Sequence, residues 1–97
     1  MHIIKLMEFT CDPKKNETNV RERSLPLLVA RVMFTSEMLV REDTRRVYPE
    51  QRFIGYTTLA GRLMVAVFCL PSDEHTHIIS FRKANNREQK KFENKKL

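Results

Sequence analysis

An unbroken run of eight apolar residues, Leu63–Leu70, constrains the fold of this 97-residue chain more than any other feature. Its length and its content of Val, Met and Phe are typical of a strand that is covered on both faces. The next four residues, 71–74 (PSDE), predict a turn, because Pro cannot donate to a sheet and Ser and Asp bond to their own backbone. Residues 76–82 then alternate, which predicts a second strand of a hairpin. The alternation assigns two faces: His77, Ile79 and Phe81 on one, and Ile78, Ser80 and Arg82 on the other.

Turn and capping residues divide the rest of the chain. In chain order they predict a strand over His2–Phe9, a polar helix from Asp12–Pro13 to about Arg23, a second helix capped by Ser24, strands over Met38–Arg41 and Arg52–Leu59, the hairpin, and a last helix from Asn85 to about Glu93. The second helix is apolar almost all round, so it is the expected packing helix. This order predicts an α+β fold. An antiparallel sheet of four to five strands is packed, on one side, by two N-terminal helices and a C-terminal helix.

Residues 1–97 are expected to form a single domain, with a basic C-terminal helix and tail over residues 85–97. The formal net charge is +6, and from Arg82 onward there are seven Lys or Arg residues against two Glu. Such an excess predicts an anionic partner: nucleic acid, an acidic protein or, less often, a membrane surface. The alternative is a soluble protein that is merely basic. The basic end, with Arg87, Lys90 and Lys91, is either a face for nucleic acid or a solvated terminus.

Several classes of protein fit the sequence poorly. Cys11 and Cys69 lie far apart and predict reduced thiols in a cytoplasmic protein. The apolar stretch His2–Met7 is too short for a signal peptide, and no run approaches the length of a bilayer span, so no membrane partner is expected. His75 and His77 share a strand face without a third ligand, so we expect no metal. The chain has two glycines and no glycine-rich phosphate loop, so we expect no cofactor.

Metal-free RNA cleavage is the chemistry that fits the residues best. It needs a base for the ribose 2′-hydroxyl, cations for the phosphate and an acid for the leaving 5′-oxygen. The cations at strand ends or edges are Arg52, Arg62, Arg82 and Lys83. Candidates for proton transfer are His77, Glu50 and Tyr48. Each also has a purely structural explanation. His77 could be a histidine on the sheet surface, Glu50 the ion-pair partner of Arg52, and Tyr48 a packing aromatic.

Over roughly Phe9–Glu93 the chain resembles the BrnT family, ribonuclease toxins of type II toxin–antitoxin pairs. The resemblance begins with Asp12-Pro13, Lys15 and Asn19, where the family has Asp, Lys and Asn at that spacing. It continues through Glu42-Asp43-Thr44-Arg45, Tyr48, Glu50, Arg52-Phe53, Gly55 and Gly61-Arg62-Leu63. Its most specific part is Ile78-Ile79-Ser80-x-Arg82-Lys83-Ala84 followed by Glu88.

The resemblance implies a RelE-like sheet and RNA cleavage that inhibits translation. It also implies a cognate antitoxin, typically a ribbon-helix-helix protein, that forms a hetero-oligomeric complex with the toxin. The antitoxin represses the shared operon, so operator DNA is contacted only through it. Together with the basic character of the first and last helices, the resemblance gives an expected RNA-binding set: Lys15, Asn19, Arg23, Arg45, Ser80, Arg87, Lys90 and Lys91.

Three departures from the family pattern leave alternatives open. Glu22-Arg23-Ser24 stands where the family usually has Lys-His-Gly, and an Arg can hold a phosphate but cannot exchange a proton near neutrality. His77 stands at a family Arg, and Cys11 at a family Trp. The alternatives to an active nuclease are therefore a degenerate, non-catalytic toxin homologue, or a basic nucleic-acid-binding module that acts with its antitoxin in operon repression.

Overall fold

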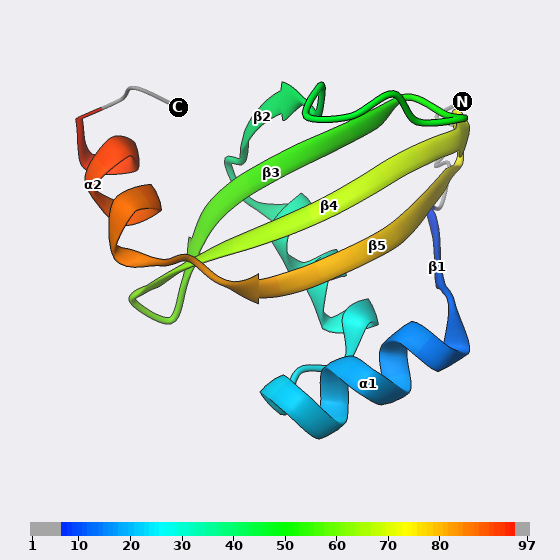
Figure 1. The fold of residues 1–97 in the computed structure, drawn as a ribbon, viewed down its shortest axis with the longest axis horizontal. Helices are drawn as coiled ribbons and strands as arrows, with labels where there is room; N and C mark the ends of the chain where they lie inside the picture. The colour runs from blue at the N-terminus through cyan, green and yellow to red at the C-terminus, as the bar shows by residue number, and fades with distance from the viewer. Residues whose placement is uncertain (1–6, 95–97) are drawn as a thin grey trace, which may run out of the picture.

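The computed structural model describes residues 7–94 (Figure 1). In chain order the elements are β1 (Glu8–Cys11), α1 (Pro13–Arg23), the 3₁₀ helix η1 (Leu27–Thr35), β2 (Leu39–Glu42), β3 (Arg52–Leu59), β4 (Arg62–Ser72), β5 (His75–Lys83) and α2 (Asn86–Glu93). The α+β class predicted from the sequence is confirmed. Most of the strand predicted over His2–Phe9 lies outside the described residues, and β1 begins at Glu8.

The sheet has the strand order β1-β5-β4-β3-β2. The pairs β2–β3, β3–β4 and β4–β5 are antiparallel, but β1 runs parallel to β5, with Thr10 opposite His77. The prediction of an antiparallel sheet is therefore wrong at one edge, and the sheet is mixed. The strand connections explain the difference, because β1 is separated from β5 by nearly the whole chain, whereas the other paired strands are joined by hairpins or a loop.

One face of the sheet, here called the η1 face, is covered by η1. Leu27, Ala30 and Met33 recur every third residue and are all buried, because a 3₁₀ helix has three residues per turn. They pack against the even-numbered side chains of β4, such as Ala66 and Phe68. The apolar packing helix predicted from the sequence is confirmed in place but is 3₁₀ rather than α. Ser24 does not cap it. Instead, Ser24 ends α1 in the left-handed conformation, with φ of 56°.

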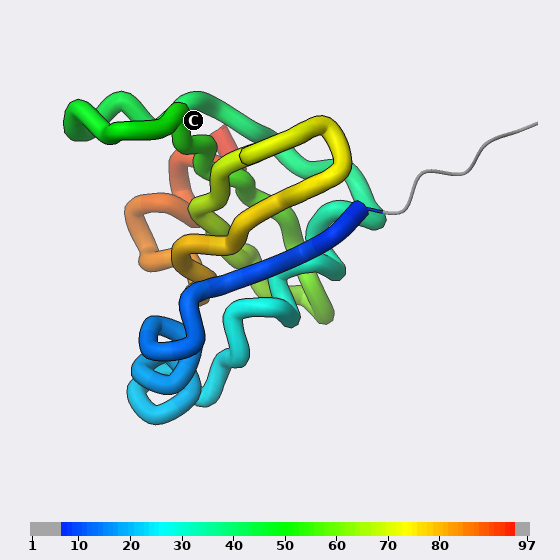
Figure 2. The backbone as a smooth tube through the Cα atoms, turned by 90° about the vertical axis from the view of Figure 1, so that its right-hand side faces the viewer, coloured from blue at the N-terminus to red at the C-terminus, as the bar shows by residue number. Residues whose placement is uncertain are grey.

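The opposite face, here called the α2 face, carries a second apolar cluster. It contains Ile54 and Tyr56 of β3 and the odd-numbered side chains of β4, and Phe92 of α2 packs against it. Helices therefore lie on both sides of the sheet, as the end-on view shows (Figure 2). The prediction that the helices share one side is wrong, because β4 is apolar on both faces and both need cover. The predicted capping box at Asn85 and Glu88 is present and begins α2.

A β-bulge shifts the side chains of β5. Val67 pairs with Ser80 and Phe68 with Ile78, so Ile79 is the extra residue. As a result, Ile78 and Phe81 both belong to the η1-face core. The strict alternation predicted from the sequence had placed these two residues on different faces. The register with β4 puts His77, Ser80 and Arg82 together on the α2 face.

Residues 7–94 contain no helix that is long and apolar enough to cross a membrane. They also contain no cluster of three His, Cys, Asp or Glu side chains that could hold a metal ion. Both thiols are free, and desolvation raises the pKa of Cys11 and of buried Cys69, so both are protonated near neutrality.

Candidate functional site

The second half of β5 has α1 as its neighbour instead of β1. The pairing with β1 ends at Ile78, and beyond that point the buried Asn19 of α1 connects the helix to the strand. Its Nδ2 donates to the carbonyl of Phe81 at 3.0 Å and to the carbonyl of Leu25 at 2.7 Å. Asn19, which the sequence placed in the RNA-binding set, therefore holds α1 against the sheet edge.

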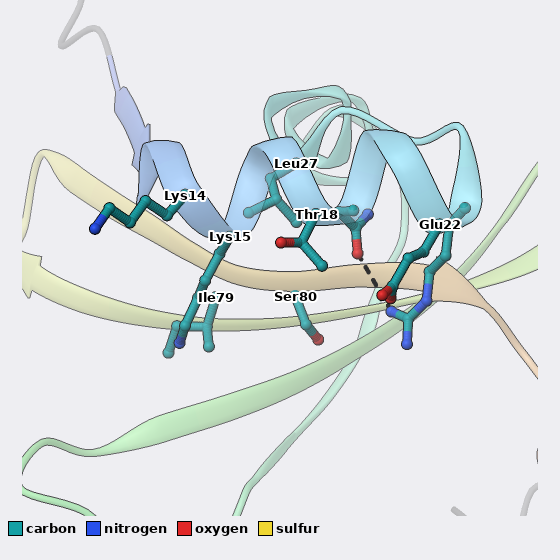
Figure 3. A pocket seen from close by; sticks show the side chains of 9 residues that line it. Lys14, Lys15, Thr18, Glu22, Leu27, Ile79 and Ser80 are labelled. Atoms are coloured by element: carbon teal, nitrogen blue, oxygen red, sulfur yellow. Dashed lines mark hydrogen bonds between the residues drawn. The ribbon is translucent and has the colours of Figure 1, made fainter.

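A groove of about 420 Å³ lies between α1 and β5 (Figure 3). Its walls are polar, with three cations and one carboxylate from α1, and its apolar floor comes from η1 and β5. The lining residues are Lys14, Lys15, Thr18, Asn19, Glu22, Arg23, Leu27, Ile79 and Ser80. In the view of Figure 3, Thr18 and Ser80 lie between Lys15 and Glu22. Their two hydroxyls can hydrogen-bond to a phosphate held by the cations.

A second hollow, of about 310 Å³, continues the first. It is lined by Arg23, Leu25, Arg82 and Lys83, so Arg23 belongs to both. We call the two hollows together the basic groove, and its cations are Lys14, Lys15, Arg23, Arg82 and Lys83. Five cations along one strand edge form a positive surface that attracts a polyanion.

Arg82 is already paired with a carboxylate. Its NH1 and NH2 atoms donate to the two carboxylate oxygens of Glu88, at 2.7 and 2.9 Å. This bidentate contact raises the pKa of Arg82 and lowers the pKa of Glu88, with smaller opposing contributions from desolvation. One end of the groove is therefore partly neutralised by the first turn of α2.

The remaining catalytic candidates lie away from the groove. Arg52 donates to Glu50 at 2.7 Å and stacks on the ring of Tyr48 at 4.1 Å, so these three residues form one cluster at the start of β3. Glu50 is thus the ion-pair partner of Arg52, which is the structural explanation considered for it from the sequence. Arg62 donates to the carbonyl of Ala84 at 2.8 Å and anchors the chain after β5.

His77 shares a hydrogen-bonding partner with His75. Thr10 Oγ1 lies 2.8 Å from His77 Nδ1 and 2.6 Å from His75 Nε2. Since one hydroxyl contacts both rings, the two histidines hold β1 against β5. His77 does not line the basic groove, although it lies on the same strand as Ser80 and Arg82.

The expected RNA-binding residues divide between three places. Lys15, Arg23 and Ser80 meet in the groove. Arg45 forms a two-pronged ion pair with Asp43, with both distances 2.8 Å, in the loop between β2 and β3. The cations of α2 line a separate hollow of about 380 Å³: Arg87, Lys90 and Lys91.

Three groove residues were not predicted from the sequence. Lys14 and Thr18 were not among the expected binding residues, and Glu22 was noted only as a departure from the family pattern. They follow each other at intervals of four, as do Lys15, Asn19 and Arg23. Residues spaced by four share a helix face, so once α1 was predicted the spacing could have identified them together.

A family model described as the ribonuclease toxin BrnT of type II toxin–antitoxin systems matches residues 11–88. The chain belongs to the BrnT family. The matched span includes α1, β5 and the Arg82–Glu88 pair, and with them the whole basic groove. The resemblance inferred from the sequence motifs is therefore confirmed.

The BrnT fold is also seen in a solved structure. The crystal structure of the Brucella abortus ribonuclease toxin BrnT superposes on this chain with a TM-score of 0.64 at 20% identity. The match covers 82% of this chain and 99% of the Brucella chain. A comparison with curated proteins finds no match. At this level of identity the structural match shows a shared fold, while membership of the BrnT family rests on the family model.

Proposed function

We propose that this BrnT-family chain is a metal-independent endoribonuclease whose basic groove binds the RNA backbone, and whose activity inhibits translation. The supporting observation is the convergence of Lys14, Lys15 and Arg23 with Arg82 and Lys83 along one edge of β5. The family description supports ribonuclease chemistry, and the groove supplies the cations that such chemistry needs.

The groove is suited to phosphates more than to bases. None of its lining residues, all of which lie within residues 7–94, is aromatic, so the groove offers no surface on which a base could stack. Lysine and arginine side chains with two hydroxyls instead match the phosphate and sugar oxygens of a single strand. We therefore expect binding that depends weakly on sequence.

The cations also stabilise the reaction itself. In metal-free cleavage the ribose 2′-oxygen attacks the adjacent phosphorus, the bond to the 5′-oxygen breaks, and a 2′,3′-cyclic phosphate forms. Negative charge accumulates on the phosphoryl oxygens in the transition state, and fixed cations in a groove stabilise that charge. Arg23 occupies the best position for this role, because it lines both hollows.

The proposal includes a cognate antitoxin and a cytoplasmic location. A type II antitoxin is a protein, and a chain with a net charge of +6 and five cations in one groove is complementary to an acidic segment. We expect a ribbon-helix-helix antitoxin that forms a hetero-oligomeric complex, covers the groove and contacts operator DNA on behalf of both proteins.

Cleavage of single-stranded RNA by the purified chain, in the presence of a chelator, tests the proposal. Arg23→Ala and Lys15→Ala should each weaken RNA binding and slow cleavage by about tenfold, since each removes a charge-assisted contact. Each should also make the slope of the logarithm of the binding constant against the logarithm of the salt concentration shallower by about 0.7 per lost phosphate contact. Arg21→Ala, which removes an exposed cation of α1 outside the groove, is the matched control, and equal effects in all three variants would show that net charge rather than the groove determines binding.

A non-catalytic homologue is the second candidate, and the Arg82–Glu88 pair favours it because the guanidinium is occupied. Expression in cells separates the two functions. A nuclease should stop growth and shorten transcripts when induced without its antitoxin. Growth at the normal rate, with the protein present at verified levels, would support binding without cleavage.

A further inference from the structure

Glu22 is the one carboxylate among the groove-lining residues of the described range 7–94. The other polar groups there are Lys and Arg cations, an amide and two hydroxyls, and none of these readily accepts a proton near neutrality. Cleavage through the 2′-oxygen needs a group that removes the 2′-hydroxyl proton. Within the groove, Glu22 has the chemistry for that task.

Three other acidic side chains that belong to the earlier catalytic or binding candidates, or that pair with them, are already engaged. Glu88 is bound by Arg82, Glu50 by Arg52 and Asp43 by Arg45. The Glu22 carboxylate makes no hydrogen bond or ion pair with any residue in the described part of the chain. It is exposed, and Figure 3 shows it reaching from the last turn of α1 toward the strands, on the side of the helix that carries Thr18.

The charged groups that line the first hollow with Glu22 all come from α1. They are Lys14, Lys15 and Arg23, while β5 contributes Ile79 and Ser80 there and the cations Arg82 and Lys83 to the second hollow. A phosphate bound by these cations would place its neighbouring ribose in the same groove as the carboxylate. A carboxylate there also repels the phosphate, so Glu22 lowers RNA affinity in the ground state.

We propose that Glu22 is the general base of RNA cleavage, an inference that rests on the proposed nuclease function. Its carboxylate takes the proton of the 2′-hydroxyl as the bond from the 2′-oxygen to phosphorus forms. The bond from phosphorus to the 5′-oxygen breaks, and the 5′-oxygen takes a proton from solvent. Glu22 then returns its own proton to solvent, so the step consumes no other reactant.

Glu22→Gln is the test, because it keeps the size of the side chain and removes its basicity. The expected result is a fall of about 10²- to 10⁴-fold in the single-turnover cleavage rate at saturating protein, the range of general-base catalysis. RNA affinity should stay the same or rise, because a repulsive charge has gone. The matched control is Glu17→Gln, an exposed position on α1 outside the groove, which should cleave at the wild-type rate.

The pH profile gives a second readout. With Glu22 as the base, Glu22→Gln should change the pH dependence of the cleavage rate, whereas the control Glu17→Gln should keep the wild-type profile. Glu22→Asp should retain part of the activity.

Two results would overturn the inference, and they differ in whether the proposed nuclease function survives. Cleavage by Glu22→Gln within about threefold of the wild-type rate would make Glu22 a surface carboxylate, while the nuclease function would stand. A wild-type chain that binds RNA but never cleaves it would overturn both. Thermal unfolding of each variant distinguishes a lost base from a lost fold.

Discussion

The guanidinium of Arg82 and the carboxylate of Glu88 face each other across the short link between β5 and α2, joined by hydrogen bonds of 2.7 and 2.9 Å. The same carboxylate accepts the backbone N–H of Asn85 at 2.9 Å as the second half of the capping box. Glu88 therefore both begins α2 and occupies the group that RNA would use at that end of the groove.

Glu88→Gln should release Arg82 and tighten RNA binding severalfold. A glutamine at this position can still complete the capping box, so α2 should persist. Titration of a labelled single strand at fixed salt measures the effect. Glu93→Gln changes the net charge by the same amount at an exposed site on the same helix, and it should bind as the wild type does. Weaker binding by Glu88→Gln alone would instead show that Glu88 orients Arg82 toward the RNA.

Asn19→Ala should destabilise the fold more than it affects RNA contacts directly. The change leaves the carbonyls of Leu25 and Phe81 without their side-chain donor, which costs about 2–3 kcal/mol of unfolding free energy. Urea denaturation measures the loss, and Asn86→Ala, an exposed position on α2, is the control. A stable Asn19→Ala protein that no longer binds RNA would restore the role expected from the sequence.

His77→Ala should leave cleavage within a few-fold of wild type and lower stability by about 1 kcal/mol, because it removes a hydrogen bond to Thr10. His75→Ala removes the equivalent bond and should behave in the same way. Single-turnover cleavage and thermal unfolding of the two variants make the comparison. Loss of turnover in His77→Ala alone, with RNA binding intact, would identify His77 as a proton-transfer group.

Stability should fall as the pH drops from about 4 toward 2. Contact with Arg45 lowers the pKa of Asp43 from 3.8 to about 2. A carboxyl with a lowered folded pKa contributes stability above its unfolded pKa and loses it as the pH approaches the folded value. Arg45 is largely exposed, so solvent screens its attraction to Asp43. The ion pair therefore contributes about 1–2 kcal/mol to the free energy of unfolding.

Asp43→Asn should remove that part of the acid dependence. Thermal unfolding between pH 2 and 7 measures it, and Asp73→Asn in the exposed β4–β5 turn is the control. An acid dependence that is unchanged in Asp43→Asn would show that the Asp43–Arg45 pair contributes nothing to stability.

Local signals predicted the helix α1 and the strand β4 well. The bounds of α1 follow from Asp12 as its cap and Pro13 at its first position, and β4 from the apolar run Leu63–Leu70. Features that depend on distant contacts were not predictable. The bulge at Ile79 arises from the register with β4, and the parallel pairing of β1 joins residues at opposite ends of the chain.

The candidate site was predicted only in part, because it too depends on contacts between distant segments. Lys15, Arg23 and Ser80 were foreseen and do meet in the groove. The pairing of Arg82 with Glu88 was not foreseen, because it depends on how α2 turns back after β5. Glu50 and Tyr48 were predicted as proton-transfer candidates, and both contact Arg52 away from the groove.

The parallel contact between β1 and β5 sets an order of events during synthesis. Thr10 and His77 are 67 residues apart, so closing this contact is slow and must wait until β5 has been made. One wall of the groove is α1, which follows β1 directly, and the other is β5 itself. A growing chain therefore has no assembled groove until β5 has been synthesised, however early α1 forms.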